Sequence, residues 1–236
     1  RARVIHLHMR GHGKSGQPAD PENLSIVNLA RDWDELLDHL NIQDALVIGH
    51  SMGVQVALEV YNHYAHRVTG LILMCGSFEN PAATFHDDRL MELMLPYLRS
   101  ASKMVGPRLK KIWSRLVTLP VAFKVAQLAE IHPDLTRRED FEPYLKHLSD
   151  MDPHLFFRLL TGAAAHSAND YLEKIDVPTL VIGGIDDRFT PGWLSEAMAA
   201  RIPSAQLLMI EEGTHTAPIE HPTLINVRVN QFIDTV

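Results

Sequence analysis

The chain has 236 residues, enough for one large domain or for a domain with an insertion. Hydrophobic residues make up 46% of it and charged residues 22%, an ordinary balance for a globular protein. The net charge of −7 and the scattered Lys and Arg residues argue against nucleic-acid binding. No apolar stretch approaches the roughly 20 residues that a membrane-spanning helix needs. The single cysteine, Cys75, excludes an intrachain disulfide, which is compatible with a cytoplasmic location.

Short apolar runs alternate with helix-patterned stretches along most of the chain. The runs are nearly continuous in their apolar character, which is typical of parallel strands covered on both faces. This alternation predicts a doubly wound, mostly parallel α/β sheet with right-handed crossovers. The predicted strands are Val4–His8, Ala45–Gly49, Gly70–Cys75, Thr179–Gly183 and Gln206–Ile210, and the predicted helices between and after them are 21–41, 52–68, 191–203 and 221–236.

The alternation stops between Ser77 and about Ile175. The region contains helix-like runs and no convincing strand, and Pro and Gly residues punctuate these runs, with Gly106 and Pro107 between the first two. We therefore expect a core formed by residues 1–77 and 176–236, with residues 78–175 as a helical insertion over one edge of the sheet.

The segment RGHGKSGQPADP, residues 10–21, contains a Gly-Lys-Ser sequence like the end of a phosphate-binding loop. Such a loop needs a glycine five positions before its second glycine, and that position here is His8. It must also lead directly into a helix, whereas Pro18 and Pro21 follow Ser15 closely and oppose a helix start. We expect a structural loop here; an ATP-dependent shift in melting temperature would revive the nucleotide-binding interpretation.

The second predicted strand leads directly into GHSMG, residues 49–53, and a helix-patterned stretch follows. This G-x-S-x-G pattern at a strand-to-helix turn is typical of a nucleophile elbow, in which the serine backbone is strained. Gly49 and Gly53 lack a Cβ atom, so we expect them to let strand and helix approach closely on either side. Ser51 would project above the carboxyl end of the sheet, and the Met52 N–H would face a developing oxyanion.

A serine nucleophile needs a general base, and the chain has 14 histidines. His215 follows the last predicted strand, so it is expected at the same carboxyl edge of the sheet as Ser51. A carboxylate must orient the imidazole, and the loop after the fourth predicted strand offers Asp186 and Asp187.

Four ordered segments together resemble the α/β-hydrolase superfamily of single-domain esterases. The Gly-x-x-Asp-x-x-x-Pro spacing of the third segment implies that Asp187 is the acid of a triad with Ser51 and His215. The resemblance covers most of the chain outside residues 78–175, and it implies that this insertion is a cap above the active site. The segments are RVIHLHMRGHGKSGQP, VIGHSMGVQVALEVY, PTLVIGGIDDRFTP and GTHTAPIEHP.

The family also has earlier strands and a His-Gly loop whose backbone donates a second oxyanion N–H, and these have no counterpart in the sequence. On one hypothesis, the chain is an incomplete copy of a longer protein. On the other, Val4–His8 pairs directly with Ala45–Gly49, and the exposed edge of the shortened sheet favours a homodimer. An N-terminal mass measurement on the purified protein distinguishes them.

The resemblance implies a serine hydrolase that cleaves carboxylic esters of small or medium acyl chains through an acyl-enzyme. Its partner is a small-molecule ester, and the mechanism requires no metal or organic cofactor. Lactone cleavage, C–C bond hydrolysis and perhydrolysis use the same triad and stay open, as does a non-catalytic binding protein on a hydrolase fold. Aromatic residues of the insertion are candidates to wall an acyl pocket, although packing within the insertion explains each equally well: Trp113, Phe123, Phe156 and Phe157.

Overall fold

The computed structural model describes residues 3–20, 23–87 and 89–236. At its centre is a four-stranded parallel sheet whose strand order, β1-β2-β3-β4, is the order in the sequence. The predicted α/β class is confirmed, and four of the five predicted strands begin and end within two residues of their expected bounds. The strands are β1 (Ala45–His50), β2 (Val68–Met74), β3 (Thr179–Gly184) and β4 (Ala205–Ile210).

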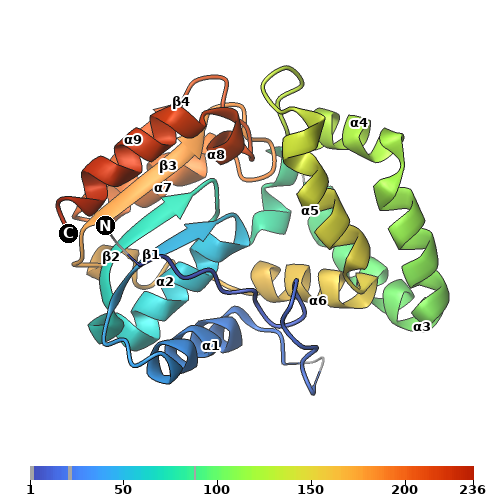
Figure 1. Ribbon diagram of the computed structural model, residues 1–236, viewed down its shortest axis with the longest axis horizontal. Helices are drawn as coiled ribbons and strands as arrows, with labels where there is room; N and C mark the ends of the chain where they lie inside the picture. The colour runs from blue at the N-terminus through green and yellow to red at the C-terminus, as the bar shows by residue number, and fades with distance from the viewer. Residues whose placement is uncertain (1–2, 21–22, 88) are drawn as a thin grey trace.

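Helices cover both faces of the sheet (Figure 1). On one face lie α1 (Ile26–His39), α2 (Met52–Tyr64) and α7 (Gly192–Arg201), and on the other lie the short α8 (Ala217–Glu220) and α9 (Pro222–Ile233). This arrangement places the carboxyl ends of all four strands at one edge.

The two faces of β2 show how the sequence produces this layering. Successive residues of a strand point to opposite faces. Leu71 and Leu73 accordingly join the apolar core beneath α1, α2 and α7, whereas Ile72 and Met74 join the core beneath α9. A strand buried on both faces needs the continuous apolar run that the sequence has here.

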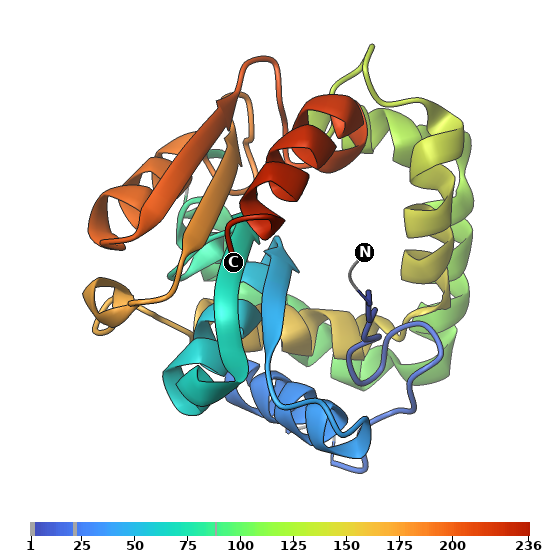
Figure 2. The ribbon, with the colours of Figure 1, turned by 60° about the vertical axis from the view of Figure 1, so that its left-hand side comes forward.

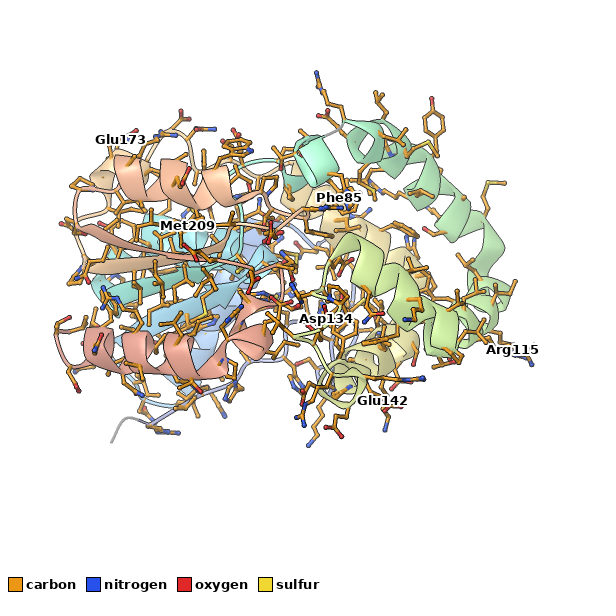
Figure 3. The ribbon with its side chains drawn as sticks, turned by 90° about the horizontal axis from the view of Figure 1, so that it is seen from above. Phe85, Arg115, Asp134, Glu142, Glu173 and Met209 are labelled. Carbon is orange, nitrogen blue, oxygen red and sulfur yellow. The ribbon has the colours of Figure 1, made fainter. Side chains whose placement is uncertain are left out.

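Residues 78–175, which we call the helical insertion, separate β2 from β3. They contain α3 (Leu90–Thr118), α4 (Pro120–Ala129), α5 (Arg138–Asp150) and α6 (Pro153–Ala164), and no strand among their described residues. Viewed from above, the insertion lies beside the sheet rather than within its layers (Figure 3). Short 3₁₀ helices complete the fold: η1 (Ala65–Arg67), η2 (Pro81–Ala83), η3 (Phe85–Asp87) and η4 (Leu172–Lys174).

The expectation that Pro and Gly divide the first part of the insertion is wrong. The single helix α3 runs through Pro96, Gly106 and Pro107 for 29 residues. A proline removes one backbone hydrogen bond, but Pro96 lies on the exposed side of α3, where water can satisfy the carbonyl that is left free. Pro143 lies inside α5 in the same way.

The predicted strand Val4–His8 is also wrong. Residues 3–9 form no strand, β1 pairs only with β2, and no described residue before α1 belongs to the sheet. Figure 2 shows this dark blue segment apart from β1. An extended segment becomes a strand only when a neighbour accepts and donates its hydrogen bonds, and β1 does not serve as that neighbour. The hypothesis of direct pairing between Val4–His8 and Ala45–Gly49 is therefore excluded.

Candidate active site

Ser51 lies at the sharp turn between β1 and α2. Its backbone angles, φ 55° and ψ −124°, fall in the left-handed half of conformational space that non-glycine residues rarely adopt. The turn is held from the neighbouring strand, because the Ser51 N–H donates to the Met74 carbonyl at 3.0 Å. This strained geometry is the one that the G-x-S-x-G pattern predicts.

The glycines of the elbow have unequal roles. A Cβ atom on Gly49 would lie 2.2 Å from the Gly53 carbonyl oxygen, so β1 and α2 can approach each other only with glycine at this position. A Cβ atom on Gly53 would meet nothing within 4 Å, so the expectation that Gly53 permits close packing is wrong. Gly76, after β2, has that second role instead, since its Cβ atom would lie 2.6 Å from the Ser51 carbonyl oxygen.

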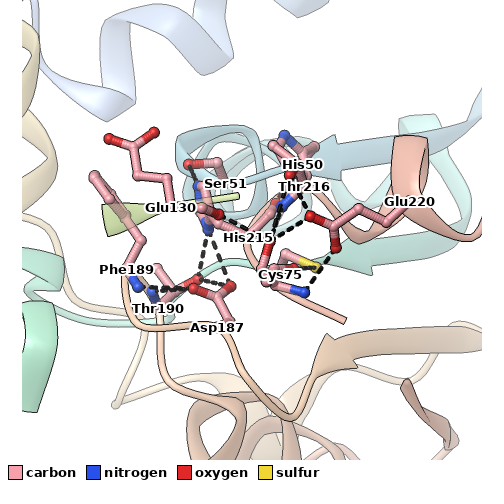
Figure 4. A network of polar contacts seen from close by, with 11 residues as sticks. His50, Ser51, Cys75, Glu130, Asp187, Phe189, Thr190, His215, Thr216 and Glu220 are labelled. Carbon is pink, nitrogen blue, oxygen red and sulfur yellow. Dashed lines mark hydrogen bonds and ion pairs between the residues drawn. The ribbon is translucent and has the colours of Figure 1, made fainter. Parts of the chain in front are cut away.

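His215 follows β4 and reaches Ser51 across the carboxyl edge of the sheet. Its Nε2 atom lies 2.8 Å from Ser51 Oγ, and its Nδ1 atom lies 3.0 Å from Asp187 Oδ2 (Figure 4). A carboxylate accepts, so Nδ1 carries the hydrogen and Nε2 is left as the acceptor for the Ser51 hydroxyl. Only 6% of the His215 surface is exposed, which limits competition from water.

Asp187 is fixed by the loop after β3. Its Oδ1 atom accepts hydrogen bonds from the Phe189 and Thr190 backbone N–H groups, both at 2.8 Å. Its Oδ2 atom accepts from the Thr190 hydroxyl at 2.9 Å as well as from His215. The neighbouring Asp186 is exposed, and only its backbone enters this network. Of the two aspartates that the sequence offered, the structure brings Asp187 to the histidine.

The N-terminus of α2 faces the space in front of Ser51. The Met52 N–H has no hydrogen-bond acceptor within the described parts of the chain. Free N–H groups and the helix dipole at such an end favour an anion. This N–H is therefore available to an oxygen that gains charge beside Ser51 Oγ.

Two residues that the sequence reasoning missed hold the His215 loop. His50 Nε2 donates to the His215 carbonyl oxygen at 2.8 Å, so His50 carries its hydrogen on that atom. The pKa of His50 is lowered by the surrounding protein and by the adjacent His215, although part of the ring stays open to solvent. A neutral His50 can make this contact at neutral pH. Its position next to the serine in G-x-S-x-G was the only signal in the sequence.

Glu220 is the second missed residue. Its carboxylate accepts from the Thr214 N–H at 2.8 Å and the Thr216 hydroxyl at 2.7 Å, on either side of His215 in the sequence. It also accepts from the His132 N–H at 2.9 Å and the Thr136 hydroxyl at 3.2 Å, both in the insertion. Burial opposes its ionisation, but the hydrogen bonds outweigh burial and lower its pKa. Glu220 therefore joins the histidine loop to the insertion.

A cavity of about 1080 Å³ opens in front of Ser51, between the sheet and the insertion. Of the aromatic residues proposed for its wall, Phe156 lines it. Trp113 and Phe157 are not among its lining residues; their rings pack against Phe156 with centroids 5.4 Å from it, and the Trp113 indole N–H donates to the Leu148 carbonyl. Phe123 packs with Phe141 inside the insertion.

Glu130 brings a carboxyl group into the same cavity. Figure 4 shows its side chain beside Ser51 without a contact to the other residues drawn, and no hydrogen bond or ion pair joins its carboxylate to another described residue. Burial raises its pKa, and the neighbouring Asp187 adds to this shift while His215 opposes it. The cavity thus presents an acid that a substrate group can reach.

The loop at residues 10–16 lines the cavity instead of capping a helix. Gly11 and Gly13 adopt left-handed conformations, with φ 77° and 52°, and allow the tight turn. Arg10 fixes the loop to α1 through Asp32, with Nε and Oδ2 2.7 Å apart, and Lys14 is exposed. The segment that resembled a phosphate-binding loop forms part of the cavity wall.

Comparison with known proteins places the chain in a family. The model of the family described as "alpha/beta hydrolase fold" matches residues 1–222. The chain therefore belongs to the alpha/beta hydrolase fold family and is a hydrolase-fold enzyme, as the four sequence segments indicated.

Individual relatives are named for different activities. A putative carbamate hydrolase RutD from Azorhizobium caulinodans is 26% identical over 96% of this chain and 79% of its own length. A 2-hydroxy-6-oxononadienedioate/2-hydroxy-6-oxononatrienedioate hydrolase from Cupriavidus pinatubonensis is 28% identical over 98% and 76%. A thermophilic esterase from Thermogutta terrifontis superposes with a TM-score of 0.70 at 22% identity, over 96% of this chain and 78% of that one. The last likeness concerns the fold alone.

Proposed function

We propose that this enzyme cleaves carboxylic esters of small or medium acyl chains through an acyl-enzyme, with Ser51 as nucleophile. The observation that carries the proposal is the hydrogen-bonded chain from Ser51 Oγ through the His215 ring to Asp187, at the end of an open cavity. A serine becomes nucleophilic when an oriented base can take its proton, and this chain supplies both the base and its orientation.

In the proposed reaction, His215 Nε2 accepts the Ser51 proton while Oγ attacks the ester carbonyl carbon. The imidazolium that forms is stabilised by Asp187, and it then gives its proton to the departing alcohol oxygen. Water next attacks the acyl-enzyme, with His215 again as base, and the carboxylic acid leaves. The Met52 N–H stabilises the oxyanion formed in both steps.

The helical insertion is proposed to act as a cap, because its residues Tyr144, Phe156 and Leu159 line the cavity opposite Ser51. An apolar wall suits an acyl chain or an apolar alcohol group. On this proposal Phe156 contacts substrate, whereas Trp113 and Phe157 support it from behind.

The charge of the cavity favours a neutral ester over a dioate, the substrate for which the relative from Cupriavidus pinatubonensis is named. A dioate has two carboxylates, whereas the cavity wall contains four acidic residues and two lysines. One of these acids, Glu130, has no cation paired with it in the described chain. A dianion would meet like charge there, whereas a neutral or cationic ester would not.

The test is hydrolysis of p-nitrophenyl esters of increasing acyl length by wild type, Ser51→Ala and Asp187→Asn, beside a lactone, a carbamate and a dienedioate. We expect the short and medium esters to be turned over best. Ser51→Ala should abolish turnover, and Asp187→Asn should lower kcat by roughly 10⁴-fold, while the exposed control Asp186→Asn changes little. Preference for one of the other three substrates would overturn the ester assignment.

A fluorophosphonate probe separates an enzyme from a non-catalytic binding protein. Such a probe reacts with an activated serine, so wild type should be labelled and Ser51→Ala should not. Absence of labelling in both would favour a binding protein on this fold.

A further inference from the structure

The outer face of α3 and α4 exposes an unusual amount of apolar side chain. Ten of the 21 large hydrophobic residues that are exposed in the described chain lie between positions 90 and 125. Met104 is 87% exposed and Tyr97 is 73% exposed, which is extreme for side chains of their size. The ten, which we call the apolar stripe, are Leu90, Leu93, Met94, Tyr97, Met104, Ile112, Leu116, Leu119, Val121 and Val125.

The stripe follows one side of the helix. At about 100° per residue, Leu90, Tyr97 and Met104 all project within a sector of roughly 40°. Leu95 lies in the opposite sector and is buried against the rest of the insertion. The helix α3 therefore has two apolar sides, one buried in the insertion and one exposed.

Positive charge accompanies the stripe. Residues 89–129 contain eight of the 22 Lys and Arg residues of the chain but only one of its 29 Asp and Glu residues. The chain as a whole has a net charge of −7, so the segment that forms α3 and α4 is opposite in sign to the remainder. Five of the cations are exposed and have no ion pair with another described residue: Lys103, Lys110, Lys111, Arg115 and Lys124.

The position of α3 makes this face accessible. Figures 1 and 3 show α3 at the outer rim of the molecule, with Arg115 near its far end, and α5 between α3 and the sheet. The helix α3 provides 29 residues at this rim. No helix in the described residues is long and apolar enough to cross a bilayer.

We propose that the α3–α4 face is a docking surface for an anionic lipid bilayer, on which α3 lies in the plane of the headgroups. Helices that bind this way bury an apolar face in the headgroup boundary while flanking Lys and Arg side chains bind anionic lipids. The apolar stripe supplies the first contact, and cations such as Lys111 and Arg115 supply the second.

A second copy of the chain fits the face less well. A two-fold contact brings the same surface patch of both copies together. Both halves of that contact would carry the same excess of Lys and Arg side chains, and like charges oppose association. A bilayer with anionic headgroups offers opposite charge along the whole helix.

The proposal does not rest on the proposed esterase activity, and Ser51→Ala protein should dock as wild type does. Docking would, however, hold the cavity near the lipid, because α3 packs on α5 and α6 and both contribute residues to the cavity wall. Sparingly soluble esters concentrate in that layer.

The test is flotation of the full chain with vesicles of phosphatidylcholine, alone or mixed with phosphatidylglycerol. One test variant combines Met104→Glu with Leu116→Glu, and the other combines Lys111→Glu with Arg115→Glu. Matched controls are Val227→Glu, at an exposed apolar residue of α9, and Arg31→Glu, at an exposed cation of α1. Melting temperature and hydrolysis of a soluble ester report whether each variant is folded.

We expect wild type to float with the mixed vesicles, to be released by high salt, and to float poorly with phosphatidylcholine alone. Apparent affinity for mixed vesicles should fall at least about tenfold in both test variants and stay unchanged in the controls. Wild type that does not float with mixed vesicles overturns the proposal, as do test variants that float as well as the controls. The proposal is also overturned if wild type does not bind vesicles but forms a dimer, and if the variant with Met104→Glu and Leu116→Glu is a monomer. The face would then bind a second copy of the chain.

Discussion

Replacing Glu220 with alanine tests whether this buried carboxylate positions His215, the proposed general base. Glu220 accepts hydrogen bonds from two backbone N–H groups, those of Thr214 and His132, and from the hydroxyls of Thr214, Thr216 and Thr136. Alanine leaves all five donors without this acceptor. The loop that carries the histidine and the loop of the insertion would then lose their common anchor.

The expected loss in the free energy of unfolding follows from the donors that Glu220→Ala leaves without an acceptor. Each buried polar group without a partner costs about 1–3 kcal/mol, and water entering the space offsets part of this, so Glu220→Ala should lower the free energy of unfolding by about 3–4 kcal/mol. For a chain of this size that corresponds to a decrease in Tm of roughly 6–15 °C. A shift of the imidazole by about 1 Å costs on the order of 100-fold in kcat.

The assay compares kcat and KM of wild type, Glu220→Ala and Glu220→Gln on one soluble ester, beside their melting curves. Glu220→Gln keeps one oxygen acceptor, so it should recover most of the lost kcat. The exposed Glu211→Ala, in the same loop, serves as control. A Glu220→Ala protein that melts early but retains wild-type kcat would show that Glu220 stabilises the fold without positioning the histidine, and the reasoning would be refuted.

Three further predictions concern other parts of the molecule. Gly49→Ala should abolish folded, active protein, because the new Cβ atom would overlap the backbone of α2. Gly53→Ala should fold normally and raise KM, because its Cβ atom projects into free space in the cavity. Circular dichroism and steady-state kinetics check both variants. The pKa of Glu59 is lowered to about 2 from 4.5, so its ionised form stabilises the fold above about pH 4.5, and this contribution, on the order of 2 kcal/mol, is lost as the pH falls towards 2. Glu59→Gln should therefore lower Tm at neutral pH and lower it much less in acid. Glu130→Gln removes an acidic side chain from the cavity wall, so the KM of an ester with a carboxylate in its acyl chain should fall relative to that of a neutral ester of the same length; an unchanged ratio would show that this side chain does not reach the substrate.

The elements that the sequence predicted well depend on local rules. The elbow at Ser51 needs a strand, a helix and a glycine at Gly49. The motif GHSMG and the segments on either side of it indicate all three. Asp187 and His215 follow strands, and the carboxyl ends of parallel strands meet at one edge, so their approach follows from the topology. The strand at Val4–His8 failed because strand formation depends on a neighbour that no local pattern specifies.

The residues that escaped prediction act through distant contacts. Glu220 meets His132, 88 positions away in the sequence, and His50 meets the backbone of a residue 165 positions away. Their chemistry, a carboxyl and an imidazole, is common in this chain, so composition and spacing could not single them out. Phe156 was predicted for the cavity wall together with Phe157, but the sequence could not show that Phe156 lines the cavity and Phe157 does not.

The insertion lies in the chain between Ser51 and the two residues proposed to assist it, Asp187 and His215. A cut within residues 78–175 would yield one fragment with Ser51 and another with Asp187 and His215, and neither would hold all three residues of the proposed triad. Regained hydrolysis on mixing would then report pairing of β2 with β3. The enzyme is therefore a suitable starting point for a split reporter, in which ester hydrolysis by the reassembled fragments is the signal.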